Sequence, residues 1–299
     1  KQAGINYFVY SWLGTDTTAH IYETRITNAF LKKTQQRGMT VSTLYETSLA
    51  LEQSPERIDF ANIMSSGEVA GARFITDMLY FAEKAKNSSN HLRVDNCPRI
   101  SIYLTRNLVN AEPYFKKLQR LLRKNNQCLD IIADIVYWQN PDMPIVHSKK
   151  SSTQQWKWLA NNFTGILGYN LYSDNLNNYR GKPRKKFDDH YLNSKALNQA
   201  IWKPLAVAAG MKYIYSVQPG YDDRALRGAN RPASPPSADF FLRDWKRIVP
   251  SLRKGEHVLI TSFNEWYEGT AIEPSLVNGG SLLAASRQAV NPINKKFCK

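Results

Sequence analysis

Residues 258–274 read VLITSFNEWYEGTAIEP, and this stretch decides how the rest of the chain is interpreted. It opens with an apolar, partly β-branched run from Val258 to Thr261, which predicts a buried strand. A carboxamide, two carboxyls and two aromatic rings follow at once, from Asn264 to Glu268. Because carboxyl and carboxamide groups are costly to bury in a protein core, the stretch predicts a strand that ends in a functional site.

Glu265 and Glu268 are the candidate catalytic pair at the end of this strand. Within a strand they would point to opposite faces, so both reach one pocket only if the strand ends near Asn264 and the chain turns. Paired carboxyls that flank a glycosidic bond are the usual machinery of glycoside hydrolysis. Trp266 and Tyr267 supply rings of the kind that lie on sugar faces. The alternative interpretation is a solvated acidic loop with one half-buried tryptophan.

Residues 263–273 read FNEWYEGTAIE, which resembles the pattern FNEW-x-EGT-x-IE on the last barrel strand of glycoside hydrolase family 99, the endo-α-mannosidase family. The related WbsX-type proteins of polysaccharide clusters carry a looser version, and the GT-x-IE continuation favours the mannosidase side. Matched by position, the resemblance implies that Glu265 is the base that deprotonates the sugar's own 2-hydroxyl, which then forms a 1,2-anhydro sugar. It implies that Glu268 is the acid/base, which protonates the leaving oxygen and then activates water.

One difference from the family bears on the substrate. The family's mannosidases often read EWHEG, whereas Tyr267 takes the place of the histidine here. This difference affects the identity of the substrate more than the class of reaction. The resemblance also implies a TIM-barrel fold for the chain.

Other strand ends match the family pattern more loosely. The segment PGYDDR at 219–224 is similar to the family's PGY-x-D turn, which implies that Tyr221 and Asp222 or Asp223 contact the substrate. The alternative is a glycine-bearing turn with a capping aspartate. Glu46 matches the glutamate of the family's HIEPY segment, although the histidine before it is absent.

Trp12 matches the tryptophan of the family's SW pair, and a core aromatic is the alternative for it. Together with the residues of the 258–274 stretch, these matches give one set of expected substrate-binding residues: Trp12, Glu46, Tyr221, Asp222, Asn264, Trp266 and Tyr267.

Strand-like and helix-like patterns alternate along the whole chain, which predicts a parallel sheet with crossover helices. Helical patterns include residues 111–124 and 194–210. Polar and aromatic residues, among them Tyr103 and Arg106, gather after the strands, as in a (β/α)₈ barrel. The predicted strands lie within residues 4–12, 39–45, 98–105, 129–137, 163–172, 212–218 and 258–264.

These are seven strands, whereas a barrel has eight. Residues 3–12 read AGINYFVYSW and resemble the segment that holds the second strand in family 99. We therefore expect a single α/β TIM-barrel domain over residues 1–299, with the first strand and helix missing from this chain and the domain incomplete at its N-terminus.

The composition limits the possible partners. The net charge of +15 favours a generally basic surface over nucleic-acid binding, because no zinc spacing, helix-turn-helix or RNP-like motif accompanies it. A third interpretation of this charge is attraction to an acidic glycan. No apolar run approaches the length of a membrane span. The five histidines form no spaced pair and no G-x-G-x-x-G follows the first strand, so neither a metal nor a nucleotide cofactor is expected.

The cysteines and sequons bear on the compartment. Cys97 and Cys128 each precede a strand-like run, so neighbouring parallel strands would bring both thiols to one end of the sheet. A disulfide and two free buried thiols both remain open. Two glycosylation sequons, at Asn87 and Asn162, weakly favour a secreted or lumenal glycoprotein.

The sequence thus predicts a retaining, endo-α-mannosidase-like glycoside hydrolase that acts on an oligosaccharide or polysaccharide, with an acidic glycan allowed. A noncatalytic glycan-binding or structural protein on a degenerate barrel is one alternative. A WbsX-like role in polysaccharide assembly is another.

Overall fold

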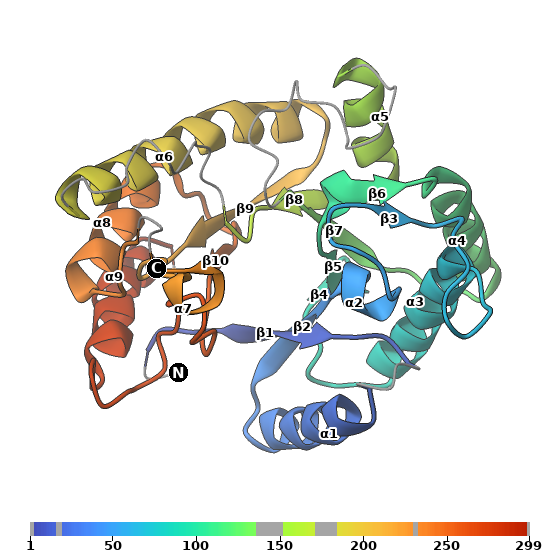
Figure 1. The fold of residues 1–299 in the computed structure, drawn as a ribbon, viewed down its shortest axis with the longest axis horizontal. Coiled ribbons are helices and arrows are strands. Elements are labelled where there is room, and N and C mark those ends of the chain that lie inside the picture. The colour runs from blue at the N-terminus through green and yellow to red at the C-terminus, as the bar shows by residue number, and fades with distance from the viewer. Residues whose placement is uncertain (1–2, 16–19, 136–151, 171–183, 230–232, 298–299) are drawn as a thin grey trace. The chain divides into compact units, whose positions relative to one another are not determined.

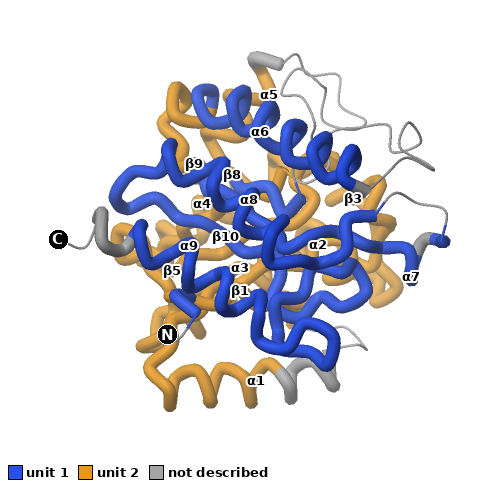
Figure 2. The backbone as a smooth tube through the Cα atoms, turned by 90° about the vertical axis from the view of Figure 1, so that its left-hand side faces the viewer, with its two compact units in different colours: residues 1–5, 167–205, 213–299 blue, residues 6–166, 206–212 orange. Residues whose placement is uncertain are grey.

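The computed structural model describes residues 3–15, 20–135, 152–170, 184–229 and 233–297. The chain forms two compact units, shown in different colours in Figure 2. Unit 1 comprises Lys1–Ile5, Leu167–Leu205 and Tyr213–Lys299, and unit 2 comprises Asn6–Ile166 and Ala206–Lys212. The prediction of a single domain over the whole chain stays a prediction.

Unit 2 is built on a parallel sheet in the order β1-β2-β5-β7. These strands are β1 (Tyr7–Trp12), β2 (Thr40–Tyr45), β5 (Cys97–Ile102) and β7 (Asp130–Asp134). Trp12 pairs with Tyr45, Tyr45 with Ile102, and Ile102 with Ala133, so the carboxyl ends of all four strands lie level. The residues that follow these strands therefore gather at one edge of the sheet.

The helices of unit 2 alternate with these strands (Figure 1). On α4, Phe115, Leu118 and Leu122 are buried at helical spacing. Phe115 packs against Phe74 of α3, with 5.0 Å between the ring centroids. The helices are α1 (His20–Gln36), α2 (Thr47–Ala50), α3 (Ala70–Lys86), η1 (Thr105–Asn107), α4 (Glu112–Lys124) and α5 (Ser152–Asn162). Three short strands complete the unit: β3 (Ile58–Asp59), β6 (Leu108–Val109), which pairs with β3, and β4 (Arg93–Val94), which pairs with β5.

The chain passes from unit 2 into unit 1 within β8 (Gly165–Leu167). In unit 1, β9 (Lys212–Val217) and β10 (Val258–Ile260) form a parallel pair in which Ile260 lies opposite Val217. The helix α6 (Arg184–Ala208) lies in unit 1 up to Leu205, and its last residues belong to unit 2. The other helices of unit 1 are α7 (Arg224–Arg227), α8 (Ala238–Ile248), η3 (Val249–Ser251) and α9 (Ser281–Phe297).

A fully buried ion pair ties α6 to α8 in unit 1. The Nζ atom of Lys195 lies 2.6 Å from Oδ2 of Asp244, and neither side chain is exposed. Arg247 donates to the other oxygen of Asp244, and the backbone N–H of Gln218, just after β9, donates to Asp244 Oδ2 at 2.8 Å. Burial lowers the pKa of Lys195 to about 8, while the cations around Asp244 hold the pKa of that carboxyl below its usual value. This network fixes the carboxyl end of β9.

All seven strands expected from the sequence are present, as β1, β2, β5, β7, β8, β9 and β10. One helix differs from its prediction, because α6 begins at Arg184 and not near Ser194. Phe187 and Tyr191 are buried at helical spacing and pack with Phe240 in a core cluster, which extends the helix toward its N-terminus. Lys185 and Lys186 therefore lie in the first turn of this helix.

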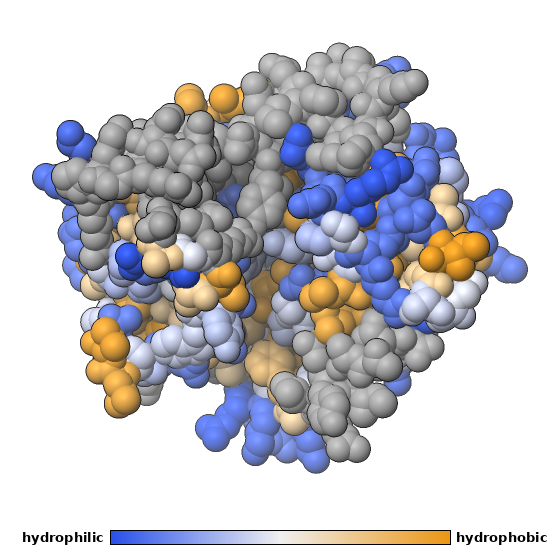
Figure 3. All heavy atoms as spheres, in the orientation of Figure 1, coloured by the Kyte–Doolittle hydropathy of each residue, from blue (hydrophilic) through white to orange (hydrophobic). Residues whose placement is uncertain are grey.

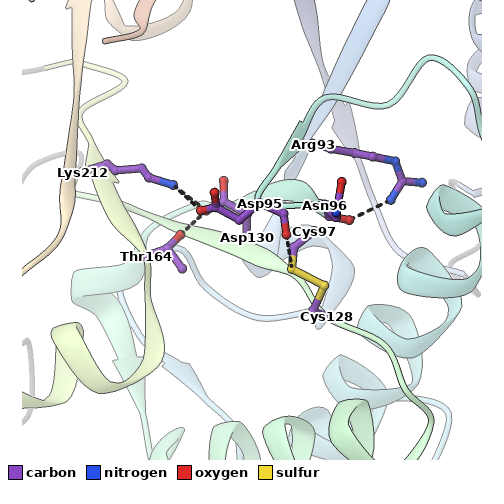
Figure 4. Close-up of a disulfide and its surroundings, with 8 residues drawn as sticks. All are labelled: Arg93, Asp95, Asn96, Cys97, Cys128, Asp130, Thr164 and Lys212. Atoms are coloured by element: carbon purple, nitrogen blue, oxygen red, sulfur yellow. Dashed lines mark hydrogen bonds and ion pairs between the residues drawn. A yellow bond between two sulfur atoms is a disulfide. The ribbon is translucent and has the colours of Figure 1, made fainter. Parts of the chain in front are cut away.

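The structure answers the open question about the cysteines. Cys97 opens β5 and Cys128 precedes β7, and their sulfur atoms are bonded with 5.2 Å between the Cα atoms. Figure 4 shows the bond beside Asp130, which accepts a hydrogen bond from Thr164 and forms an ion pair with Lys212. The two strands are parallel neighbours, as the disulfide alternative required.

Among the described residues visible in Figure 3, hydrophilic side chains prevail and hydrophobic ones form a few small patches. Among the helices that the structure describes, none combines the length and the apolar character that crossing a membrane would need.

Candidate active site

The loop after β10 folds back on itself. The strand ends at Ile260, earlier than the sequence predicted. The backbone N–H of Ser262 donates to the carbonyl of Thr270 at 3.0 Å, and that of Glu273 donates to the carbonyl of Phe263 at 2.9 Å. Because residues 262–273 form a closed loop instead of an extended strand, Glu265 and Glu268 are not forced to opposite faces.

Glu265 is held by a hydroxyl clasp inside this loop. Its backbone N–H donates to Oγ of Ser262 at 2.8 Å, and its carbonyl accepts from the N–H of Thr270 at 3.2 Å. The hydroxyl oxygens of Ser262 and Thr270 lie 2.9 Å apart. The clasp fixes the backbone of Glu265 and leaves its half-buried side chain free to act.

Glu268 is held by two other segments of unit 1. Its carboxylate accepts a hydrogen bond from the phenol of Tyr169, which follows β8, at 3.2 Å. Its carbonyl accepts from the backbone N–H of Asp222 at 2.7 Å. Tyr169 was not among the expected site residues, because nothing in the sequence distinguishes it from the other aromatics near strand ends.

Gly269 brings the loop against the turn at 219–224. It has a φ of +60°, and a Cβ atom there would lie 2.9 Å from Cβ of Asp222 and 3.1 Å from its backbone N and O. A glycine meets both demands, since it tolerates positive φ and has no Cβ. The contact therefore brings together two of the segments that the sequence singled out.

Tyr221 and Asp222 lie in this turn, but their polar groups are already engaged. Tyr221 is buried, and its phenol donates to Asp223 Oδ2 at 3.2 Å. Arg224 donates to both carboxylate oxygens of Asp222, at 2.7 and 2.6 Å, and these bonds lower the pKa of Asp222. Contact of Tyr221 or Asp222 with a substrate stays a prediction.

The aromatic pair of the loop faces solvent. Trp266 is 50% exposed and Tyr267 is 66% exposed, and Asn264 is exposed as well. The indole N–H of Trp266 donates to Oε2 of Glu273 at 3.2 Å. Since its only donor is occupied, the face of the indole is what Trp266 can offer a ligand.

Trp12 and Glu46 belong to unit 2: Trp12 is the last residue of β1, and Glu46 directly follows β2. Glu46 accepts a hydrogen bond from Oγ of Ser11 at 2.6 Å, and its N–H donates to the carbonyl of Trp12 at 3.0 Å. Trp12 is only 9% exposed and packs against Tyr45, with 5.6 Å between the ring centroids. The protein thus covers most of the Trp12 ring, which matches the core alternative, and its contact with a sugar stays a prediction.

Within the described ranges, no group of three or more histidine, cysteine or acidic residues is placed to hold a metal ion. The chemistry that this arrangement offers is that of carboxyls, hydroxyls and aromatic rings.

Comparison with protein families gives one match. A family model described as Glycosyltransferase WbsX matches residues 68–286. The matched range includes Tyr169, Glu265 and Glu268, whereas Trp12 and Glu46 precede it. No curated protein matches the sequence.

Solved structures share the fold. A structure described as a glycoside hydrolase-like protein is 18% identical, with a TM-score of 0.73, and the match covers 96% of this chain and 82% of that one. The GH99 endo-α-mannosidase from Bacteroides thetaiotaomicron in complex with bis-tris propane is 16% identical, with a TM-score of 0.62, and the match covers 98% of this chain and 81% of that one. A second structure of a GH99 endo-α-mannosidase from this organism is also 16% identical, with a TM-score of 0.61. The match covers 98% of this chain and 76% of that one. At these identities the likeness shows the fold alone, and it confirms the predicted TIM-barrel class.

Proposed function

Because this chain belongs to the Glycosyltransferase WbsX family of glycan-processing proteins, we propose that it is a glycosidase that cleaves an α-mannoside glycan in endo-α-mannosidase fashion. The observation that carries the proposal is the loop at 262–273. It holds Glu265 through the clasp of Ser262 and Thr270, and it presents Glu268 to the phenol of Tyr169. Two separately anchored carboxyls on one loop are what acid/base cleavage of a glycosidic bond requires.

The proposed reaction takes two steps and retains the anomeric configuration. First, Glu265 takes the proton of the sugar's 2-hydroxyl, whose oxygen attacks the anomeric carbon to form a 1,2-anhydro sugar. Glu268, protonated at the start, gives its proton to the leaving glycosidic oxygen. Glu268 then takes a proton from water, which attacks the anomeric carbon, and Glu265 returns its proton to the 2-oxygen. Both carboxyls regain their starting states.

The exposed groups of the loop are proposed to bind the sugar. The carboxamide of Asn264 can hydrogen-bond hydroxyls, and the exposed rings of Trp266 and Tyr267 can stack on sugar faces. Glu46, already bonded to Ser11, remains a proposed hydroxyl partner in unit 2. Trp12 and Tyr221 are mostly buried, so little of either side chain is open to a substrate.

The test compares the protein with Glu265→Gln and Glu268→Gln on α-1,2-linked mannan and on a glucosylated high-mannose glycan. Glu83→Gln, an exposed position on α3, is the matched control. We expect cleavage by the unsubstituted protein and the control, and a loss of about a thousandfold or more in kcat for either loop variant. The first product detected by NMR should retain the α configuration. If the unsubstituted protein and Glu268→Gln bind the glycan equally and neither cleaves it, a noncatalytic glycan-binding role replaces the hydrolase.

A second candidate is glycosyl transfer, which the description of the family model favours. Transfer needs an activated sugar donor, whereas hydrolysis needs only water. Incubation with an acceptor oligosaccharide, with and without a nucleotide-activated mannose, separates the two. Chain extension that depends on the donor, without cleavage of any glycan alone, would assign the transferase reaction.

We also propose a secreted or secretory-lumen location for the protein. The Cys97–Cys128 disulfide supports it, because disulfides form and persist in oxidising compartments. Fractionation of the native source with an antibody to the chain tests the location, and recovery from a reducing cytosolic fraction would contradict it.

A further inference from the structure

Arg106 holds a half-buried guanidinium that has no partner in the part of the chain that the structure describes. It lies on η1, just after β5 in unit 2. Its Nε atom is buried without a hydrogen bond. No described residue forms an ion pair or any other hydrogen bond with its side chain. Burial lowers the pKa of Arg106 from its usual value, and no nearby carboxylate offsets this.

The turn that carries Arg106 is fixed on both sides. The hydroxyl of Thr105 donates to the carbonyl of Ile102 at 2.9 Å, and the carboxamide of Asn107 donates to the carbonyl of Pro55 at 2.6 Å. Leu108 then enters β6 and pairs with Ile58 of β3. These contacts fix the backbone at Arg106, so a backbone movement that would fully expose the guanidinium to solvent is disfavoured. The described residues supply no counter-ion for Arg106, and a partly desolvated cation without one destabilises a fold. The contacts that the structure describes therefore give no stabilising role to an arginine here.

The segment that precedes Arg106 is bonded to the segment that carries Glu46, along the same edge of unit 2. The N–H of Tyr103 donates to the carbonyl of Tyr45 at 3.1 Å, and the hydroxyl of Thr47 donates to the carbonyl of Tyr103 at 2.8 Å. These bonds join the segment after β5 to the segment after β2, which carries Glu46. The carboxyl ends of parallel strands are where barrel proteins bind their ligands.

We propose that Arg106 binds an anionic substituent of the glycan, a carboxylate, phosphate or sulfate group. The planar fork of a guanidinium matches each of these groups with two parallel hydrogen bonds, and the bound anion would supply the missing counter-ion. The net charge of +15 also attracts acidic chains at long range. The inference rests on the proposed glycan substrate and narrows it to acidic glycans.

Calorimetric titration tests the proposal with four probes of similar length: a neutral α-mannan oligosaccharide, its phosphorylated form, its sulfated form and a uronic-acid oligosaccharide. The measurements use the Glu268→Gln variant, so that cleavage does not consume the probes. We expect at least one acidic probe to bind about tenfold or more tightly than the neutral one, as one bidentate charged contact implies. The probe that gains most identifies the anion.

Three substitutions in the Glu268→Gln background isolate the side chain. Arg106→Gln should remove the acidic preference, and Arg106→Lys should keep part of it, because the charge remains while the fork is lost. Arg120→Gln, at an exposed position on α4 of the same unit, should leave it unchanged. The midpoint of thermal unfolding of Arg106→Gln should stay the same or rise, because an uncompensated charge has been removed.

Equal binding of neutral and acidic probes, or an acidic preference that survives Arg106→Gln, would overturn the inference. A fall in the unfolding midpoint of Arg106→Gln together with the lost preference would also overturn it and assign a structural role. Cleavage of neutral mannan without any acidic preference would leave the proposed hydrolase intact. Acidic binding that depends on Arg106, with no cleavage of any probe by the unsubstituted protein, would leave this inference intact and overturn the hydrolase.

Discussion

The phenol of Tyr169 donates a hydrogen bond to the carboxylate of Glu268, with 3.2 Å between the two oxygen atoms. The residues lie 99 positions apart in the chain, one after β8 and the other after β10. The candidate acid is therefore oriented by a second strand end and not by its own loop alone. This relationship gives Tyr169 a role that can be measured separately from that of Glu268.

Tyr169→Phe should lower kcat by about ten- to a hundredfold, because a hydrogen bond to a charged group contributes about 1.5–3 kcal/mol. The ring and its packing remain, so the midpoint of thermal unfolding should change little. Steady-state kinetics on the cleaved glycan checks the prediction. Tyr114→Phe removes a phenolic hydroxyl from α4 and is the matched control. An unchanged kcat in Tyr169→Phe would show that Glu268 does not depend on this bond.

The bond between Trp266 and Glu273 leads to a prediction about substrate affinity. Trp266→Ala should raise KM about tenfold or more and change kcat little, because a stacking surface is lost while the carboxyls stay. Glu273→Ala should raise KM about two- to tenfold, since it frees the indole that the hydrogen bond orients. The double variant should be no worse than Trp266→Ala, because Glu273 acts through the ring. Additive effects would show that Glu273 contacts the glycan itself.

The positions of the seven strands along the chain could be predicted from the sequence, because apolar runs mark the strands and a glycine often follows the helices between them. The site at the Glu265–Glu268 loop could be predicted because its carboxyl, carboxamide and aromatic residues directly follow an apolar strand but do not fit a protein core. Tyr169 could not, since its value depends on where the carboxylate of Glu268 falls in space. The burial of Trp12 among Tyr45, Tyr80 and Phe81 is a property of packing and not of local sequence, as is the lack of a partner for Arg106 among the described residues.

Loss of the Cys97–Cys128 bond should destabilise unit 2. The bond closes a loop with a sequence separation of 31, which corresponds to about 3.5 kcal/mol of unfolded-state entropy. The double variant Cys97→Ser, Cys128→Ser should therefore unfold roughly 5–8 °C lower. Thermal unfolding with and without dithiothreitol checks this, because the reductant should shift the unsubstituted protein and leave the double variant where it is. A reductant effect of equal size on both would place the stabilisation elsewhere.

His91 should make unit 2 sensitive to acid. Burial lowers the pKa of His91 to about 4, and neither ring nitrogen has a hydrogen-bond partner among the described residues. The unfolded chain binds the proton near pH 6.5, so stability is complete above that pH and is lost as the pH falls toward 4. At pH 4.5 the loss is on the order of 2–3 kcal/mol.

Urea unfolding at pH 7 and pH 4.5 measures this dependence in the unsubstituted protein and in His91→Phe. The variant keeps an aromatic ring against Phe81, whose centroid lies 5.6 Å from that of His91, and it cannot be protonated. The difference in unfolding free energy between the two pH values should shrink by roughly 2–3 kcal/mol in the variant. An identical difference in both proteins would assign the acid sensitivity to other groups.

Gly269→Ala should test the contact that holds the loop at 262–273 against the turn at 219–224. The new Cβ would lie 2.9 Å from Cβ of Asp222, so the loop must move away from the turn at 219–224. A shift of about 1 Å at the reacting groups costs roughly a hundredfold in rate, and we expect kcat to fall by about that factor.

Gly255→Ala controls for the backbone. Gly255 has a φ of +85° with nothing within 4 Å of the added atom, so this variant has the same kind of left-handed strain without the collision. The φ strain is common to both variants and costs each about 1 kcal/mol of unfolding free energy. Gly269→Ala should lose more than that, because its added Cβ also meets Asp222. Only Gly269→Ala should lose activity, since only there does the added atom meet the turn that anchors Glu268. Equal kinetics in the two variants would mean that the contact with Asp222 does not position the loop.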